Sequence, residues 1–185
     1  MKRKHTMKNI IYFDVETQKT AEEVGGWSHI DRMKLAVAVT YSTKADEYAS
    51  YLEKNVEDLI AQLKTADLVV GFNVKRFDYT VLTSYTSVSL QQLPTVDMLY
   101  DIHRTLGFRI SLDALASATL GAKKSADGLQ AVRWYKNGDI DKVIEYCKKD
   151  VEITKQLHEY GCANGFVWFT NRRGAKQRAP VSWKL

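Results

Sequence analysis

Residues 10–17 read Ile-Ile-Tyr-Phe-Asp-Val-Glu-Thr, and this stretch decides the choice of fold. Its β-branched and aromatic residues predict a buried strand, which we expect near residues 9–14. Side chains alternate between the two faces of a strand, so Asp14 and Glu16 share one face. Two such carboxylates repel each other and are costly to bury, a cost that Mg²⁺ or Mn²⁺ would offset. An exposed Asp-x-Glu without function is the alternative.

Another carboxylate, Asp150, lies in the apolar stripe of a helix predicted near residues 139–160. At about 100° per residue, the side chains on its side of the helix are mostly apolar. They are Val143, Tyr146, Cys147, Ile153 and Leu157. A carboxylate in such a stripe is rare unless it is paired with a cation or binds a metal. The alternatives are therefore a metal ligand and a member of an ordinary buried salt bridge.

A third candidate, Asp78, follows a short apolar run at residues 68–72 that predicts another strand. We expect Asp78 to begin a helix, and an Asp in the first turn commonly interacts with the helix dipole. Asn73 precedes it and is of a residue type common in turns. This segment supports a site only in combination with the other two.

Taken in order along the chain, these pieces resemble the motifs of the DEDD superfamily of 3′→5′ exonucleases, which have a ribonuclease H-like fold. The resemblance covers roughly residues 9–160. The matching residues are Asp14, Glu16 and Thr17 in the first motif, Asn73, Phe77 and Asp78 in the second, and Tyr146 and Asp150 in the third. Tyrosine in the third motif is typical of the tyrosine subgroup, because the histidine subgroup would have His at the position of Glu145. The stretch 111–115, with Leu120, Gly121 and Lys123, also looks like small stand-alone or helicase-associated members.

The resemblance implies a mechanism and a set of contacts. Two divalent metal ions, Mg²⁺ or Mn²⁺, would be held by four carboxylates, and the Tyr146 hydroxyl would orient the attacking water. The metal ligands would be Asp14, Glu16, Asp78 and Asp150. The terminal nucleotide would contact Thr17, Asn73 and Phe77. The substrate would be nucleic acid with a free 3′ end, and the product a nucleoside 5′-monophosphate.

The order of expected elements also fits a ribonuclease H-like α/β fold, with a central mixed sheet of about five strands flanked by helices. Strands are expected near residues 9–14, 34–42, 46–52, 68–72 and 95–100. Helices are expected near 55–65, from 78 onward, and near 111–119, 128–136 and 139–160. We expect a basic N-terminal arm at residues 1–8, a nuclease domain at 9–160 and an extension at 161–185.

The extension contains five basic residues and no acidic residue. Its sequence predicts a small β-hairpin, with strands at residues 166–169 and 180–183 and a turn at 171–174. Arg172 and Arg173 are candidates for substrate binding, because basic residues among aromatic ones can pair with phosphates while bases stack. In the alternative, the aromatic residues pack on the domain and only the arginines meet solvent.

Composition limits the remaining classes. The net charge is +5, and the two cysteines suggest neither a disulfide framework nor a zinc site. A signal peptide and a membrane-spanning run are not evident, so a cytoplasmic location is expected. Two other functions stay open: a catalytically silent nucleic-acid-binding module that serves a helicase or polymerase, and a different ribonuclease H-like enzyme that cuts within a hybrid. The sequence does not distinguish DNA from RNA as substrate.

Overall fold

The computed structural model describes residues 8–122 and 128–185. Of the predicted basic arm, residues 1–7 lie outside the described residues, and so does Lys123 of the stretch that resembles small family members. Within the described ranges, no helix combines the length and the apolar character that crossing a membrane would require.

Five strands form a mixed central sheet in the order β3-β2-β1-β4-β5. The strands are β1 (Ile10–Thr17), β2 (Leu35–Ser42), β3 (Glu47–Leu52), β4 (Leu68–Gly71) and β5 (Thr95–Asp97). β1 pairs antiparallel with β2 and parallel with β4, so it is the central strand of the sheet. This is the predicted ribonuclease H-like arrangement. β1 extends three residues beyond the predicted end at residue 14, so Glu16 lies within the strand.

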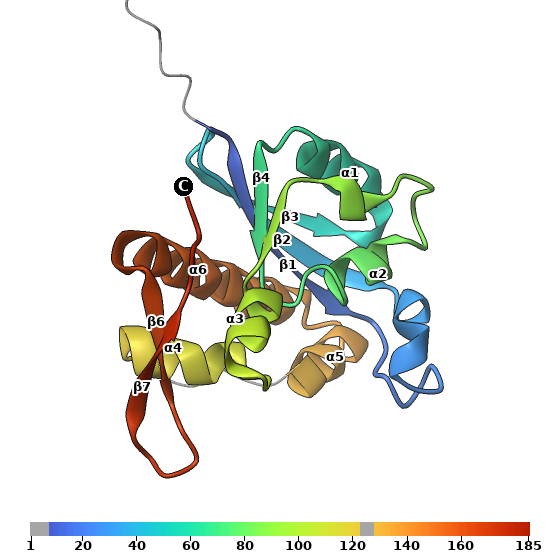
Figure 1. The fold of residues 1–185 in the computed structure, drawn as a ribbon. Helices are drawn as coiled ribbons and strands as arrows, with labels where there is room; N and C mark the ends of the chain where they lie inside the picture. The colour runs from blue at the N-terminus through green and yellow to red at the C-terminus, as the bar shows by residue number, and fades with distance from the viewer. Residues whose placement is uncertain (1–7, 123–127) are drawn as a thin grey trace, which may run out of the picture.

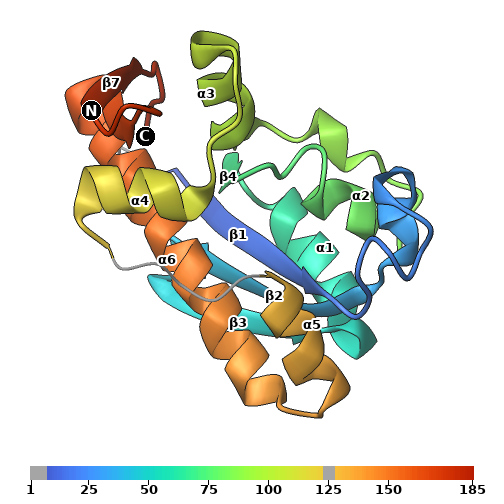
Figure 2. The ribbon, with the colours of Figure 1, turned by 90° about the horizontal axis from the view of Figure 1, so that it is seen from below.

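Helices cover both faces of this sheet (Figure 1). They are α1 (Val56–Lys64), α2 (Asp78–Leu82), α3 (Met98–Leu106), α4 (Leu112–Leu120), α5 (Gly128–Lys136) and α6 (Ile140–Asn164), with short 3-10 turns at Trp27–Arg32, Glu53–Asn55 and Leu90–Gln92. Figure 2 shows α6 crossing one face of the sheet, with α1 and α2 on the other. The acidic residues of β1 lie on the face that carries α6.

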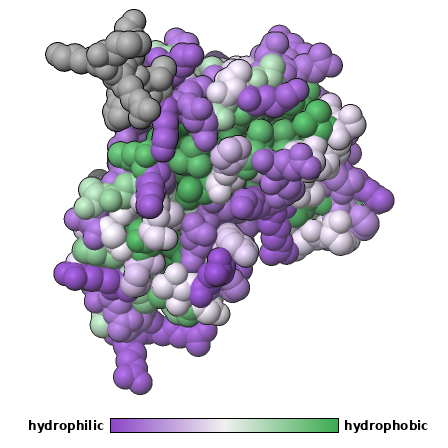
Figure 3. Space-filling view, turned by 45° about the horizontal axis from the view of Figure 1, so that its top comes forward, coloured by the Kyte–Doolittle hydropathy of each residue, from purple (hydrophilic) through white to green (hydrophobic). Residues whose placement is uncertain are grey.

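After α6, the chain forms a two-stranded antiparallel hairpin, β6 (Phe166–Thr170) and β7 (Lys176–Pro180). The hairpin was predicted, but its second strand at 180–183 was wrong. The Asn171 side chain accepts hydrogen bonds from the backbone of Arg173 and Ala175, which closes the turn early and pairs Thr170 with Lys176. Figure 3 shows hydrophilic side chains at the lowest point of the molecule, the end at which this turn lies in Figure 1.

The predicted strand at residues 95–100 was also wrong in its second half. β5 ends at Asp97, and helix α3, which the sequence analysis did not predict, begins at the next residue. The Asp97 carboxylate accepts a hydrogen bond of 3.1 Å from the backbone of Tyr100 and so caps the new helix. A short run of apolar residues did not reveal this change of direction.

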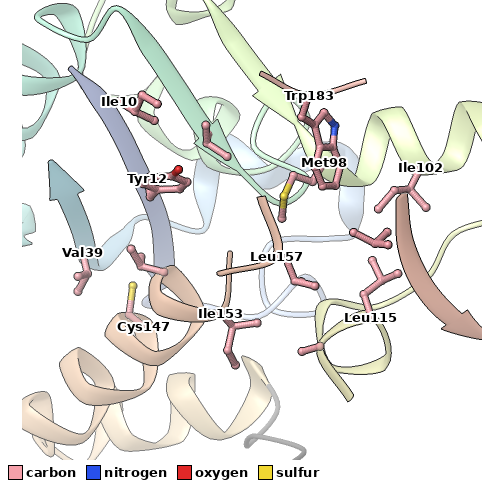
Figure 4. Packing of buried hydrophobic residues seen from close by; sticks show 14 of the residues in the cluster. Ile10, Tyr12, Val39, Met98, Ile102, Leu115, Cys147, Ile153, Leu157 and Trp183 are labelled. Atoms are coloured by element: carbon pink, nitrogen blue, oxygen red, sulfur yellow. The ribbon is translucent and has the colours of Figure 1, made fainter. Parts of the chain in front are cut away.

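Alternation along β1 divides the hydrophobic core into two clusters. Ile11, Phe13 and Val15 pack towards α1 and α2. Ile10 and Tyr12 pack with α3, α4 and α6 in the second cluster, part of which is drawn in Figure 4. Burying one large apolar side chain stabilises the fold by roughly 1.5–3 kcal/mol, so both clusters hold β1 firmly in register.

The predicted apolar stripe of α6 is confirmed. Val143, Cys147, Ile153 and Leu157 are buried, and Asp150 is buried among them. Asp150 therefore points towards the face of β1 that carries Asp14 and Glu16. The helix ends where Gly165 adopts a left-handed conformation with φ 74°, a geometry that glycine tolerates without a Cβ penalty.

Candidate active site

Three carboxylates converge between β1 and α6. Oxygen atoms of Asp14, Glu16 and Asp150 all lie within 4.8 Å of one another. The strand period places the first two on one face, and the helical stripe brings Asp150 opposite them. None of the ion pairs found among residues 8–122 and 128–185 includes any of the three. The cluster therefore brings three carboxyl groups together without a compensating side-chain cation from the described residues.

Asp78 reaches the same region from the start of α2. Its side chain is only 2% exposed, and its Oδ1 accepts a hydrogen bond of 3.1 Å from the backbone of Val15. Val15 lies between the two carboxylates of β1, so this bond fixes Asp78 beside them. Asp78 is not part of the group within 4.8 Å, but its charge acts on Asp14 more strongly than that of any other acid.

The pKa values of the four carboxyl groups show that ionising them together in this site is unfavourable. Burial, followed by the charge of Asp78, raises the pKa of Asp14 well above its usual range. Burial and then the charge of Asp150 raise the pKa of Glu16 in the same direction. Burial raises the pKa of Asp78 to about 8 and that of Asp150 to about 7. Each carboxylate resists ionisation in a low-dielectric site, which is the situation that a bound cation reverses.

Two α6 neighbours of Asp150 act on the cluster. A hydrogen bond between the Tyr146 hydroxyl and the Asp150 carboxylate opposes the rise in the pKa of Asp150. Burial, followed by the charge of Asp150, raises the pKa of the Tyr146 hydroxyl, so it stays protonated and can donate. The Cys147 thiol donates to the Asp14 carbonyl at 3.3 Å and to its Oδ2 at 3.6 Å. The sequence analysis identified Cys147 only as a core residue.

The acidic cluster lines a cavity of about 610 Å³ that opens to the surface. Thr17 and Phe77, two residues predicted to contact substrate, also line it. The Thr17 hydroxyl donates to the Lys19 carbonyl at 2.9 Å, so its hydrogen is already used within the chain. The exposed lining residues Trp27 and Leu129 were not predicted, because isolated apolar residues outside a motif carry no signal.

Asn73 lies beside the cavity rather than in its wall. It has a left-handed backbone with φ 69°, which asparagine tolerates better than most residues, and its side-chain oxygen accepts a 3.0 Å hydrogen bond from Arg109. The Asp97 carboxylate accepts bonds from the backbone of Asn73 at 2.9 Å and of Lys75 at 3.0 Å. Asp97 therefore holds the loop that leads to Asp78.

The remaining two predicted substrate contacts lie elsewhere. Arg172 and Arg173 are in the exposed turn between β6 and β7 and line a different cavity. On the hairpin, Val167, Phe169 and Ala179 pack into the core, whereas Phe166 and Trp168 are only partly buried. Both of the latter contact Tyr160 of α6, so the aromatic residues of the hairpin pack on the domain, as in the alternative.

Comparison with known proteins agrees with this geometry. Residues 11–161 match the family model of the RNase H superfamily. The chain belongs to the RNase H superfamily. No curated protein matches it. Among solved structures, the family B DNA polymerase from the hyperthermophilic archaeon Pyrobaculum calidifontis is similar, with 16% sequence identity and a TM-score of 0.63.

That similarity covers 83% of this chain and 24% of the polymerase chain, so this chain spans about a quarter of the polymerase's length. At such low identity, the match shows a shared fold. Membership of the RNase H superfamily supports nuclease activity at the family level. Nucleases of this fold use divalent metals, and the buried acidic cluster is of the kind that can bind them.

Proposed function

We propose that this protein is a metal-dependent 3′→5′ exonuclease of the DEDD tyrosine subgroup, which hydrolyses nucleic acid from a free 3′ end. One observation carries the proposal. The oxygens of Asp14, Glu16 and Asp150 lie within 4.8 Å of one another in an open cavity, while Tyr146 hydrogen-bonds Asp150. This arrangement brings Asp150 of the third motif to Asp14 and Glu16 of the first, which lie 136 and 134 positions earlier in the chain.

The residues present fit two divalent ions, Mg²⁺ or Mn²⁺. Asp14, Glu16 and Asp150 would hold one ion, and Asp14 together with Asp78 would hold the other. The fit rests on hard oxygen donors and on raised carboxylate pKa values that no cation among the described side chains relieves. When bound, two such ions supply activation of the attacking water and neutralise the charge that develops on the leaving 3′ oxygen.

The protein's own groups orient the reactants. The Tyr146 hydroxyl, fixed by Asp150, positions the attacking water. The Thr17 backbone and the Phe77 ring, which line the cavity, contact the terminal nucleotide, and Asn73 supports it from the neighbouring loop. The water oxygen bonds to phosphorus as the bond from phosphorus to the 3′ oxygen of the preceding nucleotide breaks. The product is a nucleoside 5′-monophosphate.

The proposed catalytic unit is residues 9–160, and the proposed partner is a nucleic acid strand with a free 3′ end. A helicase or polymerase is proposed as a protein partner, because the motifs resemble those of helicase-associated members of the exonuclease group. In this arrangement, the nuclease would remove terminal nucleotides from strands that the partner exposes or extends.

End-labelled strands test the proposal. With Mg²⁺ or Mn²⁺, a strand with a free 3′ end should be shortened one nucleotide at a time, whereas a 3′ block should protect it and a 5′ block should not. Asp14→Ala should abolish hydrolysis, and Glu145→Gln, which changes an exposed residue of the same helix as Asp150, should leave it unchanged. Internal cuts in a circular strand would instead indicate an endonuclease. Binding without hydrolysis by the folded protein would indicate a silent module.

A further inference from the structure

A second cavity lies between the loop that joins α3 to α4 and the β6–β7 hairpin. Its volume is about 820 Å³, and Arg109, Arg172 and Arg173 line it. Among the described residues of its wall, none is acidic. None of the ion pairs in the described ranges involves these arginines, so their charge is available to a ligand. Guanidinium groups arranged in this way suit phosphate oxygens, which they bind in a bidentate geometry.

The hairpin turn holds two of these arginines at defined positions. The Asn171 side chain accepts bonds from the backbone of Arg173 at 2.9 Å and of Ala175 at 3.0 Å. Gly174 supplies the left-handed residue that such a turn needs, with φ 80°. The strands on either side are anchored because Val167 and other inward-facing side chains pack in the core. A turn closed by its own hydrogen bonds therefore holds Arg172 and Arg173 in place.

The third arginine connects this cavity to the acidic one. Arg109 lines the arginine cavity and donates a 3.0 Å hydrogen bond to Asn73. The residue before Asn73 in the chain, Phe72, lines the acidic cavity. The Arg109–Asn73 bond therefore links a wall residue of the arginine cavity to the residue that follows a wall residue of the acidic cavity.

An aromatic side chain completes the arginine cavity. Phe108 is 46% exposed. Its ring meets Phe169 edge to face, with centroids 5.9 Å apart, and the buried Phe169 holds it in place. An exposed aromatic face beside arginines is the combination that stacks unpaired bases while the phosphates are neutralised.

We propose that this arginine cavity binds the single-stranded segment of nucleic acid that lies 5′ of the nucleotide in the acidic site. Phe108 stacks a base, and Arg109, Arg172 and Arg173 contact phosphates. The inference rests on the proposed exonuclease function for its polarity, because a 3′ end in the acidic site leaves only the 5′ portion to extend outward. The occupant is single-stranded because a base within a duplex presents no free face to Phe108.

The hairpin also offers a matched control. Arg178 lies on the other face of β7, where its guanidinium stacks on Phe166 at 4.4 Å and on Trp168 at 5.2 Å. It does not line the arginine cavity. Arg178→Ala removes one positive charge from the same hairpin without removing a proposed phosphate contact.

Binding should be measured by fluorescence anisotropy in EDTA, with DNA and RNA strands of twelve nucleotides, a dinucleotide and a blunt duplex, over a salt series. The unaltered protein is compared with Arg172→Ala/Arg173→Ala, Arg109→Ala, Phe108→Ala and Arg178→Ala. The twelve-nucleotide strand should bind more tightly than the dinucleotide or the duplex. For the double variant, the log–log salt slope should flatten by about 1.4, which is ~0.7 for each lost contact to a single strand. Phe108→Ala should weaken binding about tenfold.

Equal affinity of the double variant and the unaltered protein at every salt concentration would overturn the proposal. So would an equal loss in Arg178→Ala, which would reduce the effect to net charge, or a preference for the duplex. Hydrolysis with Mg²⁺ or Mn²⁺ is assayed separately. If the variants bind as expected but the unaltered protein hydrolyses no strand, the exonuclease proposal is wrong and the arginine-cavity proposal stands. If the unaltered protein hydrolyses strands normally but the variants bind as tightly as it does, the arginine-cavity proposal is wrong and the exonuclease proposal stands.

Discussion

Removing the charge of Asp78 should stabilise the metal-free protein while abolishing its activity. The Asp78 carboxyl is nearly inaccessible, and burial raises its pKa from 3.8 to about 8, although its own backbone N–H and that of Val15 act in the opposite direction. The charge of Asp97 adds to the rise. In Asp78→Asn, a side-chain oxygen can still accept the bond from Val15, so the packing is kept and only the ionisable group is lost.

The magnitude follows from proton linkage. At pH 7, the unfolded carboxyl is ionised and the folded one is protonated, and taking up that proton costs about 4 kcal/mol at 1.36 kcal/mol per pH unit. The pKa is higher in the folded state, so the stability that Asp78 contributes is complete below pH 3.8 and is lost as the pH rises to about 8. At pH 5 the cost falls to ~2 kcal/mol. These values are upper limits, because water entering the cavity screens the charge.

The assay is urea unfolding in EDTA at pH 5, 6, 7 and 8. Asp78→Asn should be more stable than the unaltered protein by ~2–4 kcal/mol at pH 7, and the difference should shrink towards pH 5. Glu145→Gln, at an exposed position of α6, should show little change at any pH. Addition of Mn²⁺ should stabilise the unaltered protein more than the variant. A variant that is less stable in EDTA at pH 7, or a difference that does not change with pH, would refute this reasoning.

Three further changes test other parts of the structure. Tyr146→Phe should lower the hydrolysis rate by ~10²-fold and leave metal affinity unchanged in calorimetry, because only the water-orienting hydroxyl is lost. Gly161→Ala should destabilise the protein in urea by ~1–3 kcal/mol, because its Cβ would overlap the buried Trp183 ring, and this exceeds the gain in helix propensity. In a Trp183→Ala background, the same change should instead stabilise by ~1 kcal/mol. Asp97→Ala should lower both stability and rate, since three backbone N–H groups lose their acceptor, and unchanged thermal unfolding would contradict this.

The acidic site could be predicted from the sequence because two independent periodicities place its residues. The strand period puts Asp14 and Glu16 on one face, and the helix period puts Asp150 in a buried stripe. Each pattern can be recognised from neighbouring residues in the sequence, without knowledge of the fold. Once α6 packs on the face of β1 that holds Ile10 and Tyr12, the carboxylates must meet. The mixed sheet of five strands was predicted from the order of strand and helix patterns along the chain, whereas the order of strands within the sheet was not.

Features that depend on side-chain hydrogen bonds could not be predicted in this way. α3 begins where it does because Asp97 caps it, and the same carboxylate binds the backbone of a loop more than twenty residues earlier. The register of β7 depends on the Asn171 side chain rather than on apolar alternation, because β7 is mostly polar and exposed. The contact between Arg109 and Asn73 joins positions 36 apart in the chain, and neither residue has a pattern that indicates the other.

The same burial that makes the acidic site costly also makes it useful. Four carboxylates with raised pKa values oppose folding of the metal-free chain, and the two hydrophobic clusters on either side of β1 must outweigh them. A cation that binds only the folded state returns part of this free energy, so metal affinity and fold stability are linked. The carboxyl groups must release protons when a cation binds. Metal affinity should therefore rise between pH 7 and 8, where Asp150 and Asp78 titrate. The two hydrophobic clusters therefore keep the metal-free chain folded although its acidic site opposes folding.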